Sequence, residues 1–154
     1  MDEKYIKMAI DLAIENVKNG NGGPFGALIV KDDHIIATGV NTVTTTNDPT
    51  AHAEVNAIRN ACAQLDSFQL DGCTIYSSCE PCPMCLGAIY WARADKLVFA
   101  ATKIDAAKAG FDDSFIYDEI ELPIENRKLL SIPLNHKNKL QPFQLWNTSI
   151  KTEY

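Results

Sequence analysis

The segment Ser77–Ala88 contains three cysteines, Cys79, Cys82 and Cys85, each three residues after the last. If they share a ligand, that ligand restricts the fold more than any other feature of the chain. An iron–sulfur cluster would need a fourth cysteine soon after this group, and none follows Cys85. Cys82 and Cys85 could instead form a C-x-x-C redox pair, which requires nothing elsewhere in the sequence.

A second polar group supports a metal site. His52 and Glu54 form an H-x-E pair, and Cys82 of a Pro81-Cys82-x-x-Cys85 unit follows 30 residues after His52. One His and two Cys ligands, with a Glu that is not a ligand, are the signature of the zinc deaminases. A fold that uses this signature must bring two distant segments to one ion.

The chemistry of the ligands agrees with a catalytic zinc. Three protein ligands leave one position of a tetrahedral zinc ion open. Cys82 and Cys85 are predicted in the first turn of a helix, where the helix dipole favours thiolates. His52 and Glu54 are predicted in the first turn of another helix, so the ion should lie between two helix N-termini. Glu54 is predicted to accept a proton from the attacking water and deliver it to the substrate.

Other residues that could bind metal are predicted to have ordinary structural roles. Three cysteines are expected to pack in the core and two histidines to lie on the surface: Cys62, Cys73, Cys79, His34 and His136. From their spacing alone, Asp112 and Asp113 could be a solvated pair or a helix N-cap.

The apolar periodicity predicts an α/β fold. Helices are expected over 2–19, 51–65, 83–93, 112–122 and 142–150, and strands in a hairpin over 27–40 and at 73–78 and 95–101. Thr50 is the expected N-cap of the second helix and Pro83 the first residue of the third. Strands separated by helices favour parallel pairing, which gives one mixed sheet between helices.

The length, the N-terminal sequence, the cysteine count and the net charge indicate how many domains the protein has, where it is located and which partners it lacks. A chain of 154 residues suggests one domain. The N-terminal stretch is acidic and amphipathic, unlike a signal peptide, and no stretch could span a membrane. Five cysteines, an odd number, favour a reducing compartment, so we expect a cytoplasmic protein. A net charge of −6 argues against a nucleic-acid partner.

Beyond these patterns, the chain resembles the small bacterial guanine deaminases of the cytidine deaminase-like superfamily. The resemblance is carried by five blocks: Gly22–Asp32, Asn47–Arg59, Ser78–Arg93, Ala109–Ile120 and Pro142–Asn147. The first three blocks are shared with tRNA adenosine deaminases and some cytosine deaminases, and the block around "GFDDSF" is specific to guanine deaminases. Residues 122–140 match no functional motif.

The resemblance implies a three-layer α/β/α sandwich around a five-stranded mixed sheet. It implies one Zn²⁺ per subunit on His52, Cys82 and Cys85, with Glu54 as the proton shuttle. It also implies a homodimer that exchanges a C-terminal segment, about 140–154, so that this segment closes the partner's site. The implied purine contacts are Phe25, Asn41, Ala53, Trp91, Asp113 and Tyr154.

Guanine fits these contacts chemically. Its N1–H and 2-amino group are adjacent donors that the Asp113 carboxylate can accept, whereas adenine has an acceptor at N1 and would leave the carboxylate partly unpaired. Asn41 is expected to offer both a donor and an acceptor, and Phe25 to stack on the ring. The expected reaction is attack of water at C2, with Glu54 protonating N3 and then the leaving amine, and with Asp113 as a possible second shuttle. The products are xanthine and ammonia, which places the reaction in purine catabolism or salvage.

Three alternatives remain open. A tRNA adenosine deaminase would share the metal site but would need a basic face for its anticodon loop. Deamination of guanosine or cytosine would use the same zinc chemistry with a different pocket. A structural zinc module that binds another protein would need a fourth ligand, for which Cys79 is the one candidate.

Overall fold

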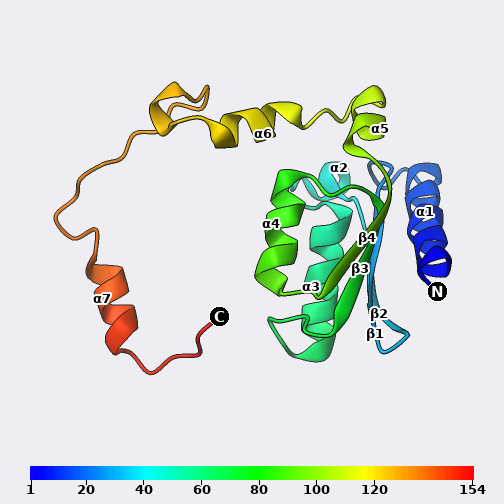
Figure 1. The fold of residues 1–154 in the computed structure, drawn as a ribbon, viewed down its shortest axis with the longest axis horizontal. Helices are drawn as coiled ribbons and strands as arrows, with labels where there is room; N and C mark the ends of the chain where they lie inside the picture. The colour runs from blue at the N-terminus through cyan, green and yellow to red at the C-terminus, as the bar shows by residue number, and fades with distance from the viewer. The chain divides into compact units, whose positions relative to one another are not determined.

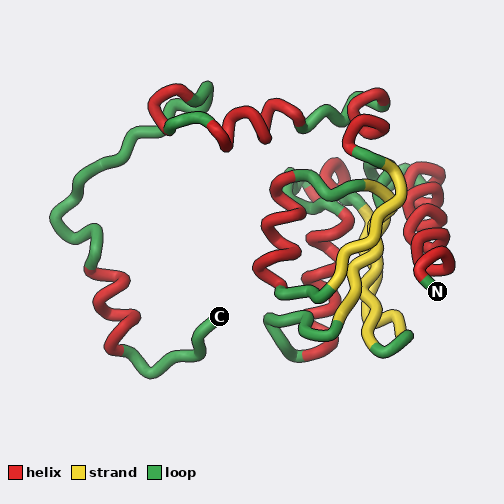
Figure 2. Tube along the Cα trace, viewed as in Figure 1, coloured by secondary structure: helices red, strands yellow, loops and turns green.

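The computed structural model describes residues 1–154 and divides into two compact units, Met1–Phe115 and Ile116–Tyr154. The first unit contains the β-sheet, and the second contains helices and loops (Figures 1 and 2). No helix is both long enough and apolar enough to cross a bilayer. The single domain expected from chain length stays a prediction.

The sheet is mixed, as predicted. Its four strands are β1 (Gly26–Lys31), β2 (His34–Val40), β3 (Cys73–Cys79) and β4 (Lys96–Ala101), in the order β2-β1-β3-β4. β1 is antiparallel to β2 and β3, and only β3 and β4 are parallel. Asp32 and Asp33 both have positive φ at the β1–β2 turn, which suits the right-handed twist of a two-residue hairpin.

The prediction of five strands is wrong. After β4 the chain enters two short helices, α5 (Lys103–Lys108) and α6 (Ser114–Glu121), and residues 109–113 between them form a turn and a loop. The later irregular stretch, 130–136, contains Pro133 and has no strand partner in its unit. Because proline lacks the N–H that a sheet ladder needs, this stretch is a poor strand former.

Helices cover both faces of the sheet. α1 (Asp2–Lys18) packs on one face, and α3 (Ala53–Leu65) and α4 (Pro83–Ala92) cover the other (Figure 1). The alternation of side chains along β3 supplies both cores. Ile75 belongs to the core under α3 and α4, whereas the Tyr76 ring packs on Tyr5 of α1 with centroids 5.0 Å apart.

The chain contains the predicted helices and three short helical elements that were not predicted. α6 and α7 (Gln141–Thr148) lie where helices were expected. Three short elements were not expected: α2 (Val43–Thr46), α5, and the 3₁₀ turn η1 (Ile124–Asn126). α5 begins with a capping box between Thr102 and Asp105, a pattern that the sequence displays.

Thr50 is not the N-cap of α3, contrary to the prediction. The helix begins at Ala53, and His52 occupies the N-cap position. The Thr50 hydroxyl donates instead to Oδ1 of Asp48 at 2.6 Å. Its side chain therefore stabilises the loop before α3 and does not cap the helix.

α3 lies very close to β2. Ala53, Ala57 and Ala61 form a fully buried stripe along the helix. A Cβ atom on Gly39 of β2 would collide with the backbone oxygen of Ala53 and the backbone nitrogen of Ala57. The absence of a side chain at Gly39 therefore sets how near the start of α3 can approach the sheet.

We expect Gly39→Ala to destabilise the protein by about 1–3 kcal/mol, because the added methyl forces the α3 backbone away from β2. Urea unfolding measures this change. Gly87→Ala in α4 is the matched control, since no atom lies within 4 Å of its added Cβ; it should be neutral or stabilising by up to about 1 kcal/mol. A Gly39→Ala protein as stable as the wild type would contradict the close packing.

Candidate functional site

Two helix N-termini carry the predicted metal ligands. His52 immediately precedes α3 and Cys82 immediately precedes α4, both with extended backbone (φ −72°, ψ 157° and φ −64°, ψ 168°). Cys85 lies in the first turn of α4, and Pro83 takes the first helical position as predicted. The fold thereby brings residues 30 positions apart to one place.

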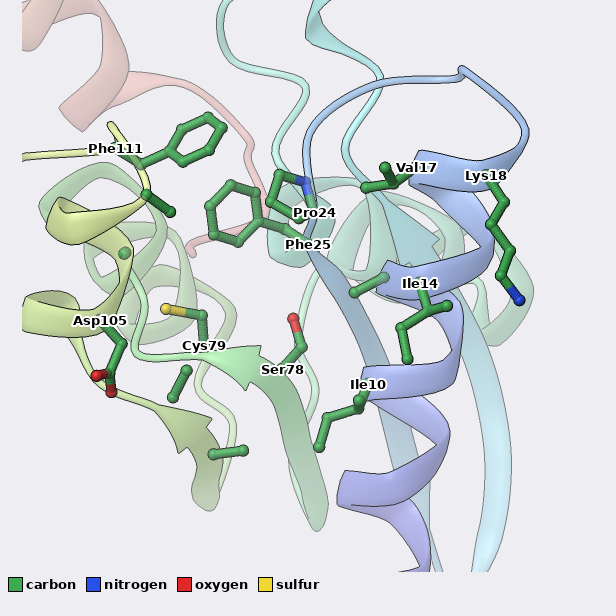
Figure 3. Close-up of a pocket in the computed structure, with 15 residues that line it drawn as sticks. Ile10, Ile14, Val17, Lys18, Pro24, Phe25, Ser78, Cys79, Asp105 and Phe111 are labelled. Atoms are coloured by element: carbon green, nitrogen blue, oxygen red, sulfur yellow. The ribbon is translucent and has the colours of Figure 1, made fainter.

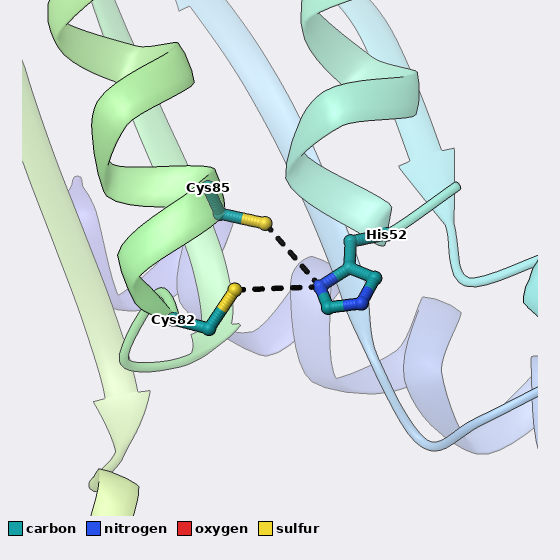
Figure 4. A group of neighbouring side chains, drawn as sticks. All are labelled: His52, Cys82 and Cys85. Atoms are coloured by element: carbon teal, nitrogen blue, oxygen red, sulfur yellow. Dashed lines mark hydrogen bonds between the residues drawn. The ribbon is translucent and has the colours of Figure 1, made fainter. Parts of the chain in front are cut away.

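The three ligand atoms have the spacing of a zinc site. Nδ1 of His52 lies 3.5 Å from Sγ of Cys82 and 3.4 Å from Sγ of Cys85 (Figure 4). All three atoms lie within 4.8 Å of one another. Zinc bonds of about 2.0–2.1 Å to nitrogen and about 2.3 Å to sulfur, at a tetrahedral angle, separate the two atoms by about 3.5 Å. The residues present therefore fit a zinc ion held through Nδ1 and leave one position without a protein ligand.

The electrostatics of the cluster favour a cation. Hydrogen bonds from the Cys85 thiol and from His52 lower the pKa of Cys82 to about 4, against the opposing effect of burial. The hydrogen bond to Cys82, followed by burial, raises the pKa of Cys85. A bound dication would stabilise both cysteines as thiolates.

Glu54 lies in the first turn of α3 and is not one of the grouped ligands. Its side chain is buried, with 5% of its surface exposed. The hydroxyl of Ser77 donates to Oε1 of Glu54 at 3.1 Å. Burial raises the pKa of this carboxyl, and hydrogen bonds, including those from Cys85 and Ser77, oppose the rise. A raised pKa makes this carboxyl easier to protonate, which suits a group that must accept a proton and then release it.

Asn41 is held in one orientation. Its Oδ1 accepts hydrogen bonds from the backbone N–H groups of Gly23 (3.3 Å) and Val43 (3.2 Å). The next residue, Thr42, donates its N–H to the carbonyl of Ala51 at 3.0 Å, which places this loop beside the residue before His52. The expectation that Asn41 offers both donor and acceptor is therefore wrong: its oxygen is occupied, and only its NH₂ group remains to bind a ligand.

Asp113 lies within electrostatic reach of the metal ligands. Its side chain is partly buried, and burial, followed by the negative charge of Cys82, raises the pKa of its carboxyl. Its neighbour Asp112 accepts the backbone N–H of Ser114 at 2.9 Å, just before α6 begins.

Three other residues predicted to contact the purine differ in burial and location, and their contacts stay predictions. Ala53 is fully buried as the first residue of α3. Trp91 lies near the end of α4 and is 68% exposed. Tyr154 belongs to the second unit, where its ring meets Trp146 edge-on with centroids 6.2 Å apart.

A separate apolar pocket of about 620 Å³ lies in the first unit (Figure 3). Phe25 lines it and meets Phe111 edge-on, with ring centroids 4.9 Å apart. None of the three ligand residues lines this pocket, nor does Glu54. Phe25 is thus the one predicted purine contact among its lining residues.

Sequence reasoning missed two buried polar residues that support the site. Ser77 is one, through its bond to Glu54. Asn16 of α1 is the other: its Nδ2 donates to the carbonyl oxygens of Gly23 (2.8 Å) and Asn41 (2.9 Å). Each is a polar residue at a position where the periodicity of its helix or strand predicts an apolar one. Such a break in the apolar pattern is the sequence signal by which both residues could have been predicted.

The comparisons with known proteins agree with this geometry. Residues 1–101 match the family described as cytidine and deoxycytidylate deaminase zinc-binding region. The chain belongs to this family, and the predicted zinc cofactor is confirmed.

The resemblance to small bacterial guanine deaminases is also confirmed. The chain is 59% identical over 153 residues to the guanine deaminase of Bacillus subtilis, covering 99% of this chain and 98% of that protein. An X-ray structure of that guanine deaminase superposes with a TM-score of 0.97, over 99% of this chain and 98% of the other. The tRNA-specific adenosine deaminase of Aquifex aeolicus is 41% identical over 99 residues, which are 64% of this chain and 65% of that protein.

We expect Cys85→Ser to lower the zinc content well below one ion per chain after dialysis, because a hydroxyl replaces one of three protein ligands. Atomic emission spectroscopy measures the content. Cys79→Ala is the matched control: Cys79 is buried nearby on β3, but its Sγ bonds the carbonyl of Thr102 and is absent from the ligand group. Loss of zinc from Cys79→Ala would contradict the three-ligand site.

Proposed function

We propose that this protein is a hydrolase that converts guanine and water to xanthine and ammonia. The observation that carries the proposal is the 59% identity to a guanine deaminase over 153 residues, which are 99% of this chain. When bound between His52, Cys82 and Cys85, zinc supplies an attacking water with a lowered pKa. Glu54 takes one proton from that water and passes it to N3 as oxygen adds to C2. It then takes the second proton from the new C2 hydroxyl and gives it to the amine, so that the C2–N bond breaks and the C2 carbonyl of xanthine forms.

Base recognition follows from two groups of opposite character. The Asp113 carboxylate accepts from N1–H and the 2-amino group, and it exchanges protons with the latter as a second catalytic group. The free NH₂ of Asn41 can only donate, which suits the acceptors N7 and O6 of guanine. Adenine presents an acceptor at N1 and an amino donor in place of O6, so it mismatches both groups. Phe25, Ala53, Trp91 and Tyr154 complete the proposed purine contacts.

A tRNA adenosine deaminase is the second candidate, because such an enzyme is 41% identical over 99 residues. Two observations favour guanine instead. The match to the adenosine deaminase covers 64% of this chain, against 99% for the guanine deaminase. The net charge of −6 also opposes binding to a phosphate backbone.

All five cysteines are free, in agreement with the reducing cytoplasm where we place the enzyme.

We further infer that the enzyme is a homodimer that exchanges its C-terminal segment, about 140–154. None of residues 116–154 is buried, so the second unit has no core of its own. It nevertheless carries large apolar side chains that are more than half exposed, including Leu129, Leu130, Leu134 and Phe143. Burial of such side chains is worth about 1.5–3 kcal/mol each, which a second copy of the chain could supply.

Ammonia release from guanine, guanosine, adenine, cytosine and cytidine tests the proposed reaction. We expect the zinc-loaded protein to act on guanine alone. Glu54→Gln should lower kcat by at least about 10²-fold, because the proton carrier is lost, while the zinc content stays the same. Glu15→Gln, at an exposed carboxylate of α1, should keep full activity. Turnover of a different substrate, or an active Glu54→Gln protein, would contradict the proposal.

Mixed dimers test the exchange of the C-terminal segment. Glu54→Gln chains and Tyr154→Ala chains are each expected to have low activity, the first for lack of a proton carrier and the second for lack of the closing residue. Unfolding and refolding the two together should restore activity, because one site in each mixed dimer combines an intact Glu54 with the partner's intact terminus. Activity no higher than the mean of the two separate proteins would show that the terminus does not act across a dimer.

A further inference from the structure

A buried hydroxyl on β3 has Glu54 as its partner. Ser77 is 2% exposed, and its bond to Oε1 of Glu54 joins the sheet to the first turn of α3. The other residues before it on this face of β3, Cys73 and Ile75, are fully buried in the core. Burying a hydroxyl in such surroundings costs free energy unless the hydroxyl is hydrogen-bonded. The bond to Glu54 provides that hydrogen bond.

The position of this hydroxyl is fixed by the sheet. β3 is an inner strand, and Ser77 is paired with Ala27 of β1 on one side and Phe99 of β4 on the other. On the opposite side of the bond, the close approach of α3 to Gly39 fixes the first turn that carries Glu54. Both ends of the Ser77–Glu54 bond are therefore attached to rigid elements, as precise placement of a reacting group requires.

We propose that Ser77 is a positioning residue for the deamination reaction: its hydroxyl holds Oε1 of Glu54 so that Oε2 faces the reacting atoms. This inference rests on the proposed function. The last torsion of a glutamate side chain has no sharp preference, so the hydrogen bonds on the carboxylate set its orientation; besides Ser77, these come from Cys85 and from the backbone of Glu54 itself. A tether on one oxygen leaves the other oxygen in a single place, where it can receive and deliver the proton.

Threonine and valine at this position separate the hydroxyl from side-chain size, because they have nearly the same shape. We expect Ser77→Val and Ser77→Ala to lower kcat for guanine by about 10- to 100-fold, the scale of a misplaced catalytic group, with KM and zinc content little changed. Ser77→Thr should keep kcat within about threefold of the wild type, because its hydroxyl can make the same bond. Equal kcat values for the Thr and Val proteins would overturn the proposal.

Ser78→Ala is the matched control. Ser78 is also buried on β3, but its Oγ accepts the N–H of Gly26 and does not bond Glu54. This variant should lose stability and keep kcat. Equal losses of kcat in Ser77→Ala and Ser78→Ala would mean that any buried hydroxyl on this strand matters, and would overturn a specific role for Ser77.

A crystal structure of zinc-loaded Ser77→Ala provides a readout without turnover. We expect the Glu54 carboxylate to be rotated or disordered in it, and ordered in the wild type. An unchanged carboxylate would overturn the proposal. Failure of the wild-type protein to act on guanine would remove the proposed function alone, since the crystallographic comparison would still decide whether Ser77 orients Glu54.

Discussion

Gly39 and a stripe of alanines on α3 allow the helix and the sheet to approach more closely than larger side chains would permit. Ala53, Ala57 and Ala61 are fully buried, and a methyl group on Gly39 would collide with the helix backbone. This contact places the first turn of α3 over the sheet at the height of Ser77. His52 precedes that turn and Glu54 lies in it, so the packing of small residues determines where a metal ligand and the proposed acid–base group lie.

The two sides of the site are held by different means. The metal side depends on backbone geometry, since His52 and Cys82 are extended residues at helix starts. The side proposed to recognise the base depends on polar contacts: Asn16 holds the backbone at Gly23 and Asn41, and two backbone N–H groups hold the amide of Asn41. In the proposed reaction, an acceptor at Asp113 and a donor at Asn41 then face guanine.

The metal ligands could be predicted from the sequence because their signature is local: each half needs only a short segment and a helix start. The helices and the hairpin were also predictable, because periodicity and turn residues are local signals. The fifth strand was not a local inference; it came from resemblance, and the structure lacks it. The capping box at Thr102 was readable but was overlooked. The Ser77–Glu54 and Asn16–Asn41 bonds join residues 23 and 25 positions apart, and such pairings depend on strand register and helix packing, which periodicity does not specify.

The residues at the starts of α3 and α4 have a further consequence. Helices usually begin with Ser, Thr, Asp or Asn, whose side chains satisfy the free N–H groups of the first turn. Here those two positions are His52 and Cys82, and neither makes a side-chain capping bond. Each helix therefore forgoes about 0.5–2 kcal/mol of local stability in order to present a ligand. A zinc ion held by His52, Cys82 and Cys85 would fasten these two uncapped helix ends together through the ligand side chains, so a chelator should loosen the fold first at these two helix starts.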